Sequence, residues 1–144
     1  MTTARDVMHA GAQCIGADQS LLDAAKMMRE MEVGALPICG ADQKLKGMVT
    51  DRDIVIRCLA TGEDPARMTA MDLASQLHCV RAADSMDTVL TKMEQHQIRR
   101  IPVIDNDRLV GMISEADLCK GHREGGRLTD QQIIEFMDSV YAQR

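Results

Sequence analysis

Two segments of the chain place a hydroxyl residue at the end of an apolar run and an aspartate three positions later. They are Thr50 with Asp53, and Ser114 with Asp117. In this spacing the hydroxyl can cap a helix, and the aspartate favours the positive end of the helix dipole. The same groups could bind a nucleotide, because a hydroxyl and a helix N-terminus donate to phosphate and a carboxylate accepts from ribose hydroxyls. Both interpretations stay open for either segment alone.

The two segments belong to a longer internal repeat. Leu-Pro-Ile at 36–38 recurs as Ile-Pro-Val at 101–103, and residues 45–54 align with 109–118. Repetition of this length indicates two copies of one structural unit. A unit of this size buries little apolar surface by itself, so we expect the two copies to pack on each other.

Each copy predicts the same order of elements: a short strand, a helix, two strands and a closing helix. Ser20 and Ser85 are the predicted N-caps of the first helices, each followed by an apolar stripe at helical spacing. Short apolar runs predict the hairpin strands at 33–39, 45–50, 98–104 and 109–114. The closing helix is expected at 51–60 in the first copy. In the second copy it is expected at 115–120, ending before Gly121.

The predicted domain organisation has three segments. The first copy covers 1–62, the second covers 66–121, and 122–144 contains a charged, Gly-rich linker and a C-terminal helix capped at Thr129. Apolar residues wrap around much of this last helix, which also holds both aromatic residues of the chain. We therefore expect it to dock on the repeats or on a partner subunit.

The repeated segments resemble a pair of CBS domains, the regulatory module named after cystathionine beta-synthase. The resemblance covers nearly all of residues 1–121, and residues 2–8, 34–40 and 50–56 are particularly similar to the stand-alone two-repeat proteins of the hypoxic response protein type. It implies an α+β fold in which two βαββα repeats pack as a pseudo-twofold pair, followed here by the tail helix. It also implies two clefts between the repeats, each able to hold an adenine nucleotide or a related adenosyl ligand.

The resemblance assigns residues of this sequence to the preferred cleft by motif. Ser114 corresponds to a phosphate-binding residue, Asp117 to a ribose-binding residue and Arg100 to a phosphate partner. The residues expected near the base, from the other copy, are Val33, Gly34 and Ala35.

In the second cleft Thr50 and Asp53 take the same roles. The residues expected to line it from the second copy are Ile98 and Arg99. Ala35 stands where the preferred cleft has an arginine, so this cleft lacks that cation. Asp51 and Glu115 follow the two hydroxyl residues directly, and their charges would repel highly charged ligands.

The predicted function is that of a non-catalytic sensor whose regulatory ligand is AMP, ADP, ATP or S-adenosylmethionine, with no required cofactor. The alternative is a structural or interaction protein with vestigial clefts that acts through dimerisation and an unknown protein partner. A homodimer is expected in both cases. An enzyme that uses metal or thiols is a third hypothesis, but no nucleophile elbow, P-loop or HExxH motif is present.

The five cysteines form no CxxC pair, which fits neither a disulfide framework nor a structural zinc site. Free thiols are the default expectation in a reducing compartment. Cys14 and Cys39 fall on strands of one copy that could be neighbours, so a disulfide between them is the alternative. Cys119 and His122 lie about one helix turn apart, but two ligands do not complete a zinc shell, and no metal site is predicted.

Composition limits the remaining classes of function. The chain has 144 residues, 17 Lys and Arg against 22 Asp and Glu, and a formal net charge of −5. This acidic balance and the lack of aromatic stacking residues argue against nucleic-acid binding. The sequence contains no apolar run long enough to span a membrane and no apolar N-terminal leader, so we expect a cytoplasmic protein without a membrane partner.

Overall fold

The main helix of each repeat begins at its predicted serine cap. Ser20 Oγ accepts a hydrogen bond from the backbone N–H of Asp23 at 3.0 Å before helix α2 (Leu21–Met31). Ser85 caps α4 (Met86–His96) in the same way. Satisfying these otherwise unpaired N–H groups stabilises the first turn of both helices.

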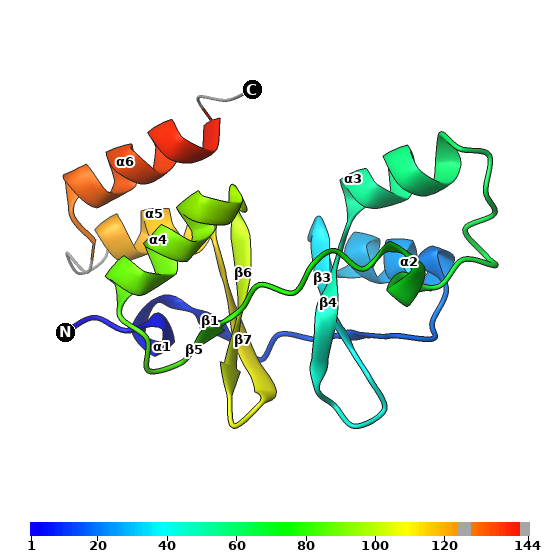
Figure 1. Cartoon of the computed structure of the whole chain (residues 1–144), viewed down its shortest axis with the longest axis horizontal. Helices are drawn as coiled ribbons and strands as arrows, with labels where there is room; N and C mark the ends of the chain where they lie inside the picture. Colours follow the sequence, from blue (N-terminus) through cyan, green and yellow to red (C-terminus); the bar gives the residue numbers. More distant parts are fainter. Residues whose placement is uncertain (124–127, 142–144) are drawn as a thin grey trace. The chain divides into compact units, whose positions relative to one another are not determined.

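Figure 1 shows the computed structural model, which describes residues 1–123 and 128–141 and divides into two compact units. The three-stranded unit, Gln13–His78, contains β2 (Ile15–Gly16), α2, β3 (Ala35–Cys39), β4 (Leu45–Thr50), α3 (Asp51–Ile54), the π-helical turn η1 (Val55–Leu59) and the 3₁₀ helix η2 (Ala70–Leu73). The four-stranded unit, Met1–Ala12 with Cys79–Arg144, contains α1 (Ala4–Val7), β1 (His9–Ala10), β5 (Val80–Arg81), α4, β6 (Arg100–Asp105), β7 (Arg108–Ser114), α5 (Glu115–Arg123) and α6 (Asp130–Tyr141).

The two sheets share one pattern of pairing. The strand order is β2-β3-β4 in one and β1-β7-β6-β5 in the other. In each, the hairpin strands are antiparallel and the short leading strand of the repeat, β2 or β5, runs parallel to its neighbour. The predicted order of strand, helix, strand, strand, helix is present in both repeats, and the mixed helix and strand class with a C-terminal helix is confirmed.

The compact units differ from the segments that the sequence repeat marks out. The N–H of Ala4 donates to the carbonyl of Asp84 at 2.8 Å, and β1 pairs with β7, so the start of the chain joins the second repeat. In the other unit, Ala70 N–H donates to the carbonyl of Gln19 at 2.8 Å, and η2 contacts β4. Each repeat is therefore completed by the segment that precedes the other repeat in the sequence.

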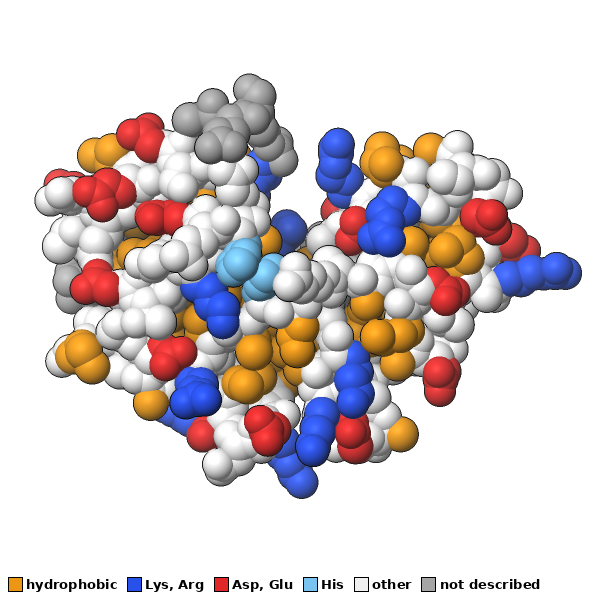
Figure 2. Space-filling view, viewed as in Figure 1, with side chains coloured by type: hydrophobic (Ala, Val, Ile, Leu, Met, Phe, Trp, Pro, Cys, Tyr) orange, Lys and Arg blue, Asp and Glu red, His pale blue; other side chains and the backbone are white. Residues whose placement is uncertain are grey.

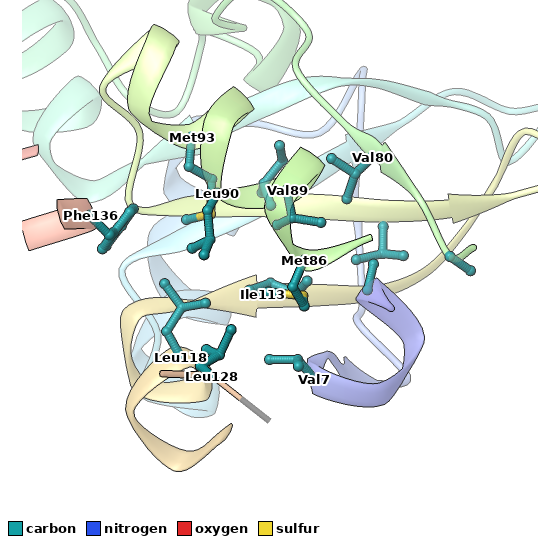
Figure 3. Packing of buried hydrophobic residues seen from close by; sticks show 14 of the residues in the cluster. Val7, Val80, Met86, Val89, Leu90, Met93, Ile113, Leu118, Leu128 and Phe136 are labelled. Carbon is teal, nitrogen blue, oxygen red and sulfur yellow. The ribbon is translucent and has the colours of Figure 1, made fainter. Parts of the chain in front are cut away.

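Aliphatic side chains fill the core of the four-stranded unit. Figure 3 shows side chains from α1, α4, α5, α6 and β7 meeting in one cluster. Phe136, the chain's single phenylalanine, is fully buried and joins α6 to this cluster. The C-terminal helix thus docks on its own repeat, the first of the two placements expected for it.

Helix α5 is longer than the sequence predicts. The expected end before Gly121 is wrong, because the helix continues to Arg123. Gly121 is buried, and a side-chain carbon there would lie 3.6 Å from both Val7 and Leu128, so packing on both sides offsets the low helix propensity of glycine. Of the helices in residues 1–123 and 128–141, none has the length and apolar character needed to cross a membrane.

A disulfide joins Cys14 and Cys39 in the three-stranded unit. Their Cα atoms are 5.7 Å apart. Cys14 directly precedes β2, and Cys39 ends β3, the parallel neighbour of β2. Thus the alternative considered from the sequence, rather than the default of free thiols, is present in the structure. The free cysteines are Cys58, Cys79 and Cys119.

Thiol counting tests this disulfide. We expect three thiols to titrate in unreduced, denatured protein and all five after reduction. In the native protein Cys58 should react last, because burial raises the pKa of its thiol and so lowers its thiolate fraction. Five reactive thiols before reduction would show that the bridge is absent in solution.

The packing of α6 on α4 places Glu94 where its replacement should stabilise the protein at neutral pH. Partial burial, and then the negative charge of Glu135, raises the pKa of the Glu94 carboxyl. Because the pKa is higher in the folded state than in the unfolded state, ionised Glu94 lowers stability at neutral pH, and this cost disappears as the pH falls through that pKa. We expect Glu94→Gln to raise the melting temperature at neutral pH by ~1 °C. The gain should vanish in mildly acidic buffer.

The matched control for this measurement is Glu30→Gln, which removes an exposed carboxylate from α2 in the other repeat. It should leave the melting temperature unchanged. A gain for Glu94→Gln that is equal at both pH values would contradict the electrostatic explanation.

Candidate functional site

The junction of β7 and α5 is built around one carboxylate oxygen. Asp117 Oδ2 accepts hydrogen bonds from the backbone N–H of Ser114 at 2.8 Å and from its hydroxyl at 2.9 Å. In return, the Asp117 N–H points to Ser114 Oγ at 3.5 Å. The helix-capping interpretation of the sequence pattern is therefore present in the structure, and any ligand would bind to an already ordered junction.

His9 contacts the same oxygen, and the sequence analysis did not identify it. Its Nδ1 lies 2.8 Å from Asp117 Oδ2, although the two residues are 108 positions apart. The pairing of β1 with β7 brings them together. The spacing of nearby residues cannot reveal a contact over this separation. Only a prediction that β1 pairs with β7 could have identified it.

A small cavity opens beside this pair within the four-stranded unit. Its volume is about 210 Å³, and its charged or ionisable lining residues are Asp6, His9, Asp117 and Lys120. Binding pockets for small molecules usually measure roughly 300–1,000 Å³. This cavity could therefore hold part of a nucleotide, but not all of it.

Arg100 and Ser114 lie directly opposite each other on β6 and β7. Directly opposed residues of antiparallel strands project to the same face of the sheet, with Cβ atoms roughly 5 Å apart. Arg100 is exposed, and in the described part of the chain no carboxylate pairs with it. One face of the hairpin end thus offers a guanidinium beside a hydroxyl at a helix N-terminus.

The three-stranded unit repeats this junction with different partners. Thr50 and Asp53 form the same reciprocal cap, with both hydrogen bonds at 3.1 Å. Asp53 Oδ1 lies 3.9 Å from the guanidinium of Arg57 in η1. Among the described residues no histidine contacts Asp53 in the way that His9 contacts Asp117. Ala35 lies opposite Thr50, which places it at the position of Arg100 as the sequence alignment indicates.

The remaining predicted site residues divide between the two units. Val33 and Gly34 lie directly before β3, and the Gly34 carbonyl accepts a hydrogen bond from the N–H of Asp51 at 2.9 Å. Ile98 packs against the core of the four-stranded unit. Arg99 Nε lies 3.5 Å from Glu115 Oε1, so its charge already has a partner.

The described residues contain no cluster of three His, Cys, Asp or Glu side chains that could hold a metal ion. His122, one of the two residues considered from the sequence, has partners at both ring nitrogens. Nδ1 lies 3.0 Å from the Leu128 carbonyl, and Nε2 lies 2.9 Å from Asp130.

The β7–α5 junction therefore combines three chemical functions. Arg100 can donate to an anion such as phosphate, and the Ser114 hydroxyl can do so when its proton turns from Asp117 Oδ2 to the ligand. Asp117 Oδ1 accepts no hydrogen bond from the described residues and can accept one from a ligand hydroxyl. This set suits a ligand that carries both a phosphate and a free hydroxyl.

Comparison with known proteins identifies the fold family. The CBS domain family model matches residues 4–59 and 70–123. The chain is 48% identical over 141 residues to Hypoxic response protein 1 of Mycobacterium tuberculosis, covering 97% of this chain and 94% of that protein. It is 34% identical over 119 residues to the CBS domain-containing protein YhcV of Bacillus subtilis, covering 83% and 84% of the two chains.

Solved structures agree with this assignment. The crystal structure of Hypoxic Response Protein I, described as having two coordinated zinc ions, superposes with a TM-score of 0.78 at 53% identity and covers 83% of this chain and 98% of that one. A hexameric CBS-CP12 protein from bloom-forming cyanobacteria gives a TM-score of 0.73 at 29% identity, with 83% and 70% coverage. The chain belongs to the CBS-domain family, as a protein built from two CBS repeats.

Proposed function

We propose that this protein is a non-catalytic regulatory module that binds an adenosine-containing ligand of the AMP, ADP, ATP or S-adenosylmethionine class. It needs no cofactor for this role and acts in the cytoplasm as a homodimer. Its similarity to a hypoxic response protein supports a role in a stress response. A ligand can regulate such a module only if it binds two conformations with different affinity, so the output is a change of shape or of partner affinity.

One observation carries the proposal: Arg100 is exposed and has no carboxylate partner among the described residues, directly opposite Ser114. A buried or paired arginine would serve stability. An unpaired arginine beside a hydroxyl and a helix N-terminus is suited to a ligand phosphate, and Asp117 is suited to a ribose hydroxyl. The assignment of the base to Val33, Gly34 and Ala35 belongs to the same proposal and rests on the family resemblance.

The β7–α5 junction is the preferred element of the two. The β4–α3 junction has the same backbone and cap, but Ala35 supplies no cation opposite Thr50. We therefore assign the higher affinity for a phosphorylated ligand to Ser114, Arg100 and Asp117.

Calorimetric titration with AMP, ADP, ATP and S-adenosylmethionine tests the proposal. We expect saturable binding of at least one of them. Arg100→Ala should weaken the binding of a phosphorylated ligand by about tenfold or more, the usual effect of losing a hydrogen bond to a charged group. Asp117→Ala, verified as folded by circular dichroism, should weaken binding similarly.

The control variant is Arg108→Ala, which removes an exposed arginine from the other end of the same hairpin. It should bind as the wild type does. Equal losses for Arg100→Ala and Arg108→Ala would indicate a general charge effect. No binding of any ligand at millimolar concentration would favour the alternative of an interaction protein with vestigial sites.

An exposed apolar surface supports the proposed homodimer. Figure 2 shows hydrophobic side chains at the surface over α3 and η1. Val55, Ile56 and Leu59 of η1 are each about half exposed. The second repeat has Lys120 and Arg123 at the positions of Ile56 and Leu59, so the fold itself does not require apolar residues there. Clustered apolar residues of this kind mark a contact surface, which we assign to a second copy of the chain.

Light scattering after size exclusion tests this assignment. We expect a mass twice that of the 15.9 kDa chain for the wild type. The double variant Ile56→Glu/Leu59→Glu should weaken association by ~tenfold or more, because it places two charges in an apolar contact. Ile134→Glu, at an exposed isoleucine of α6, is the matched control and should remain dimeric. If the Ile56→Glu/Leu59→Glu variant remains dimeric, the dimer contact does not lie at η1.

A further inference from the structure

Glu115 presents an electrostatic problem for the proposed ligand. It follows Ser114 directly, at the first position of α5. An uncompensated carboxylate there would repel a phosphate at Ser114, and it could also pair with a nearby arginine. The preferred junction would then be a poor site for a charged ligand.

The structure compensates this charge with two side chains from outside α5. Glu115 Oε1 lies 3.5 Å from Nε of Arg99, and Glu115 Oε2 accepts a hydrogen bond from the phenol of Tyr141. The guanidinium of Arg99 lies over the Tyr141 ring, 4.4 Å from its centroid. Both carboxylate oxygens of Glu115 are therefore engaged, and the three residues hold one another within the four-stranded unit.

Partial burial makes this cluster more effective than a surface ion pair. The side chains of Arg99 and Glu115 are 28% and 30% exposed. Reduced access of water strengthens both the ion pair and the cation–π contact. Tyr141 is the last described residue of α6, whose position is fixed by the burial of Phe136 and Val140. The C-terminal helix thus brings the phenol to the ligand-binding junction.

The other repeat lacks this arrangement. Asp51, which corresponds to Glu115, is exposed, and its Oδ1 accepts a hydrogen bond from the backbone N–H of Arg52 at 2.8 Å. No Lys or Arg side chain in the described residues pairs with it, and the three-stranded unit has no helix that corresponds to α6. The two junctions therefore differ in charge as well as in the presence of Arg100.

We propose that Tyr141 is a positioning residue that makes the β7–α5 junction selective for phosphorylated ligands. It holds Glu115 against Arg99, so that Glu115 does not pair with Arg100 or repel a phosphate at Ser114. Arg100 stays available as a result. This inference rests on the proposed function and adds to it a specificity for AMP-like ligands over uncharged adenosine.

Parallel titration of the full-length protein with AMP and adenosine tests the specificity. Tyr141→Phe keeps the aromatic ring over Arg99 and removes the hydroxyl. It should weaken AMP binding roughly fivefold, the effect of one lost hydrogen bond, and leave adenosine binding unchanged. Adding Glu115→Gln to Tyr141→Phe should restore AMP binding, because the charge that needs compensation is gone.

Tyrosine fluorescence gives a second readout that needs no ligand. Tyr141 is the only tyrosine, and the chain has no tryptophan, so the emission reports the surroundings of this one side chain. A carboxylate that accepts from the phenol quenches the emission, and Glu115→Gln should therefore increase it. Asp51→Asn, the equivalent change in the other repeat, is the control and should leave the emission unchanged.

Titration and fluorescence together distinguish a failure of this inference from a failure of the proposed function. Unchanged emission in Glu115→Gln would overturn the contact, and with it this inference, whatever the nucleotides do. Equal losses of AMP and adenosine affinity in Tyr141→Phe would overturn the specificity alone and leave the proposed function standing. Absence of binding by wild-type protein would overturn the proposed function and, with it, the role assigned here to Tyr141.

Discussion

In each unit, the segment that precedes the other repeat in the sequence lies close against the sheet. The rest of this structure depends on that close approach. A side-chain carbon at Gly111 would lie 2.7 Å from the carbonyl oxygen of His9, and one at Gly47 would lie 3.1 Å from that of Ser75. Glycine at these two equivalent positions lets a segment from elsewhere in the chain lie against the second strand of each hairpin. The segment that reaches β7 brings His9 to Asp117.

The internal repetition of the sequence does not make the two junctions chemically equal. Their backbones and caps match, since Thr50 and Ser114 both exchange hydrogen bonds with the aspartate three positions later. The side chains that neighbouring strands contribute differ. Arg100 lies opposite Ser114 at the β7–α5 junction, and Ala35 lies opposite Thr50 at the β4–α3 junction. The two junctions therefore share a backbone frame and differ in the side chains around it.

The C-terminal helix adds to the difference between the two repeats. It adds the only phenylalanine of the chain to one core and the only tyrosine to the junction of the same unit. The three-stranded unit has no helix that corresponds to α6. In the other repeat, Val55, Ile56 and Leu59 of η1 are each about half exposed.

Local interactions determined what could be predicted from the sequence. Capping at Ser20 and Ser85, the two hairpins and the repeat itself depend on residues near one another in the chain, so their spacing revealed them. The end of α5 was predicted wrongly, because the packing of Gly121 against Val7 involves distant residues. Tertiary structure alone decided which side chains meet at the candidate site. The contacts of His9 with Asp117 and of Tyr141 with Glu115 join residues that are 108 and 26 positions apart, and only strand pairing and helix docking bring them together.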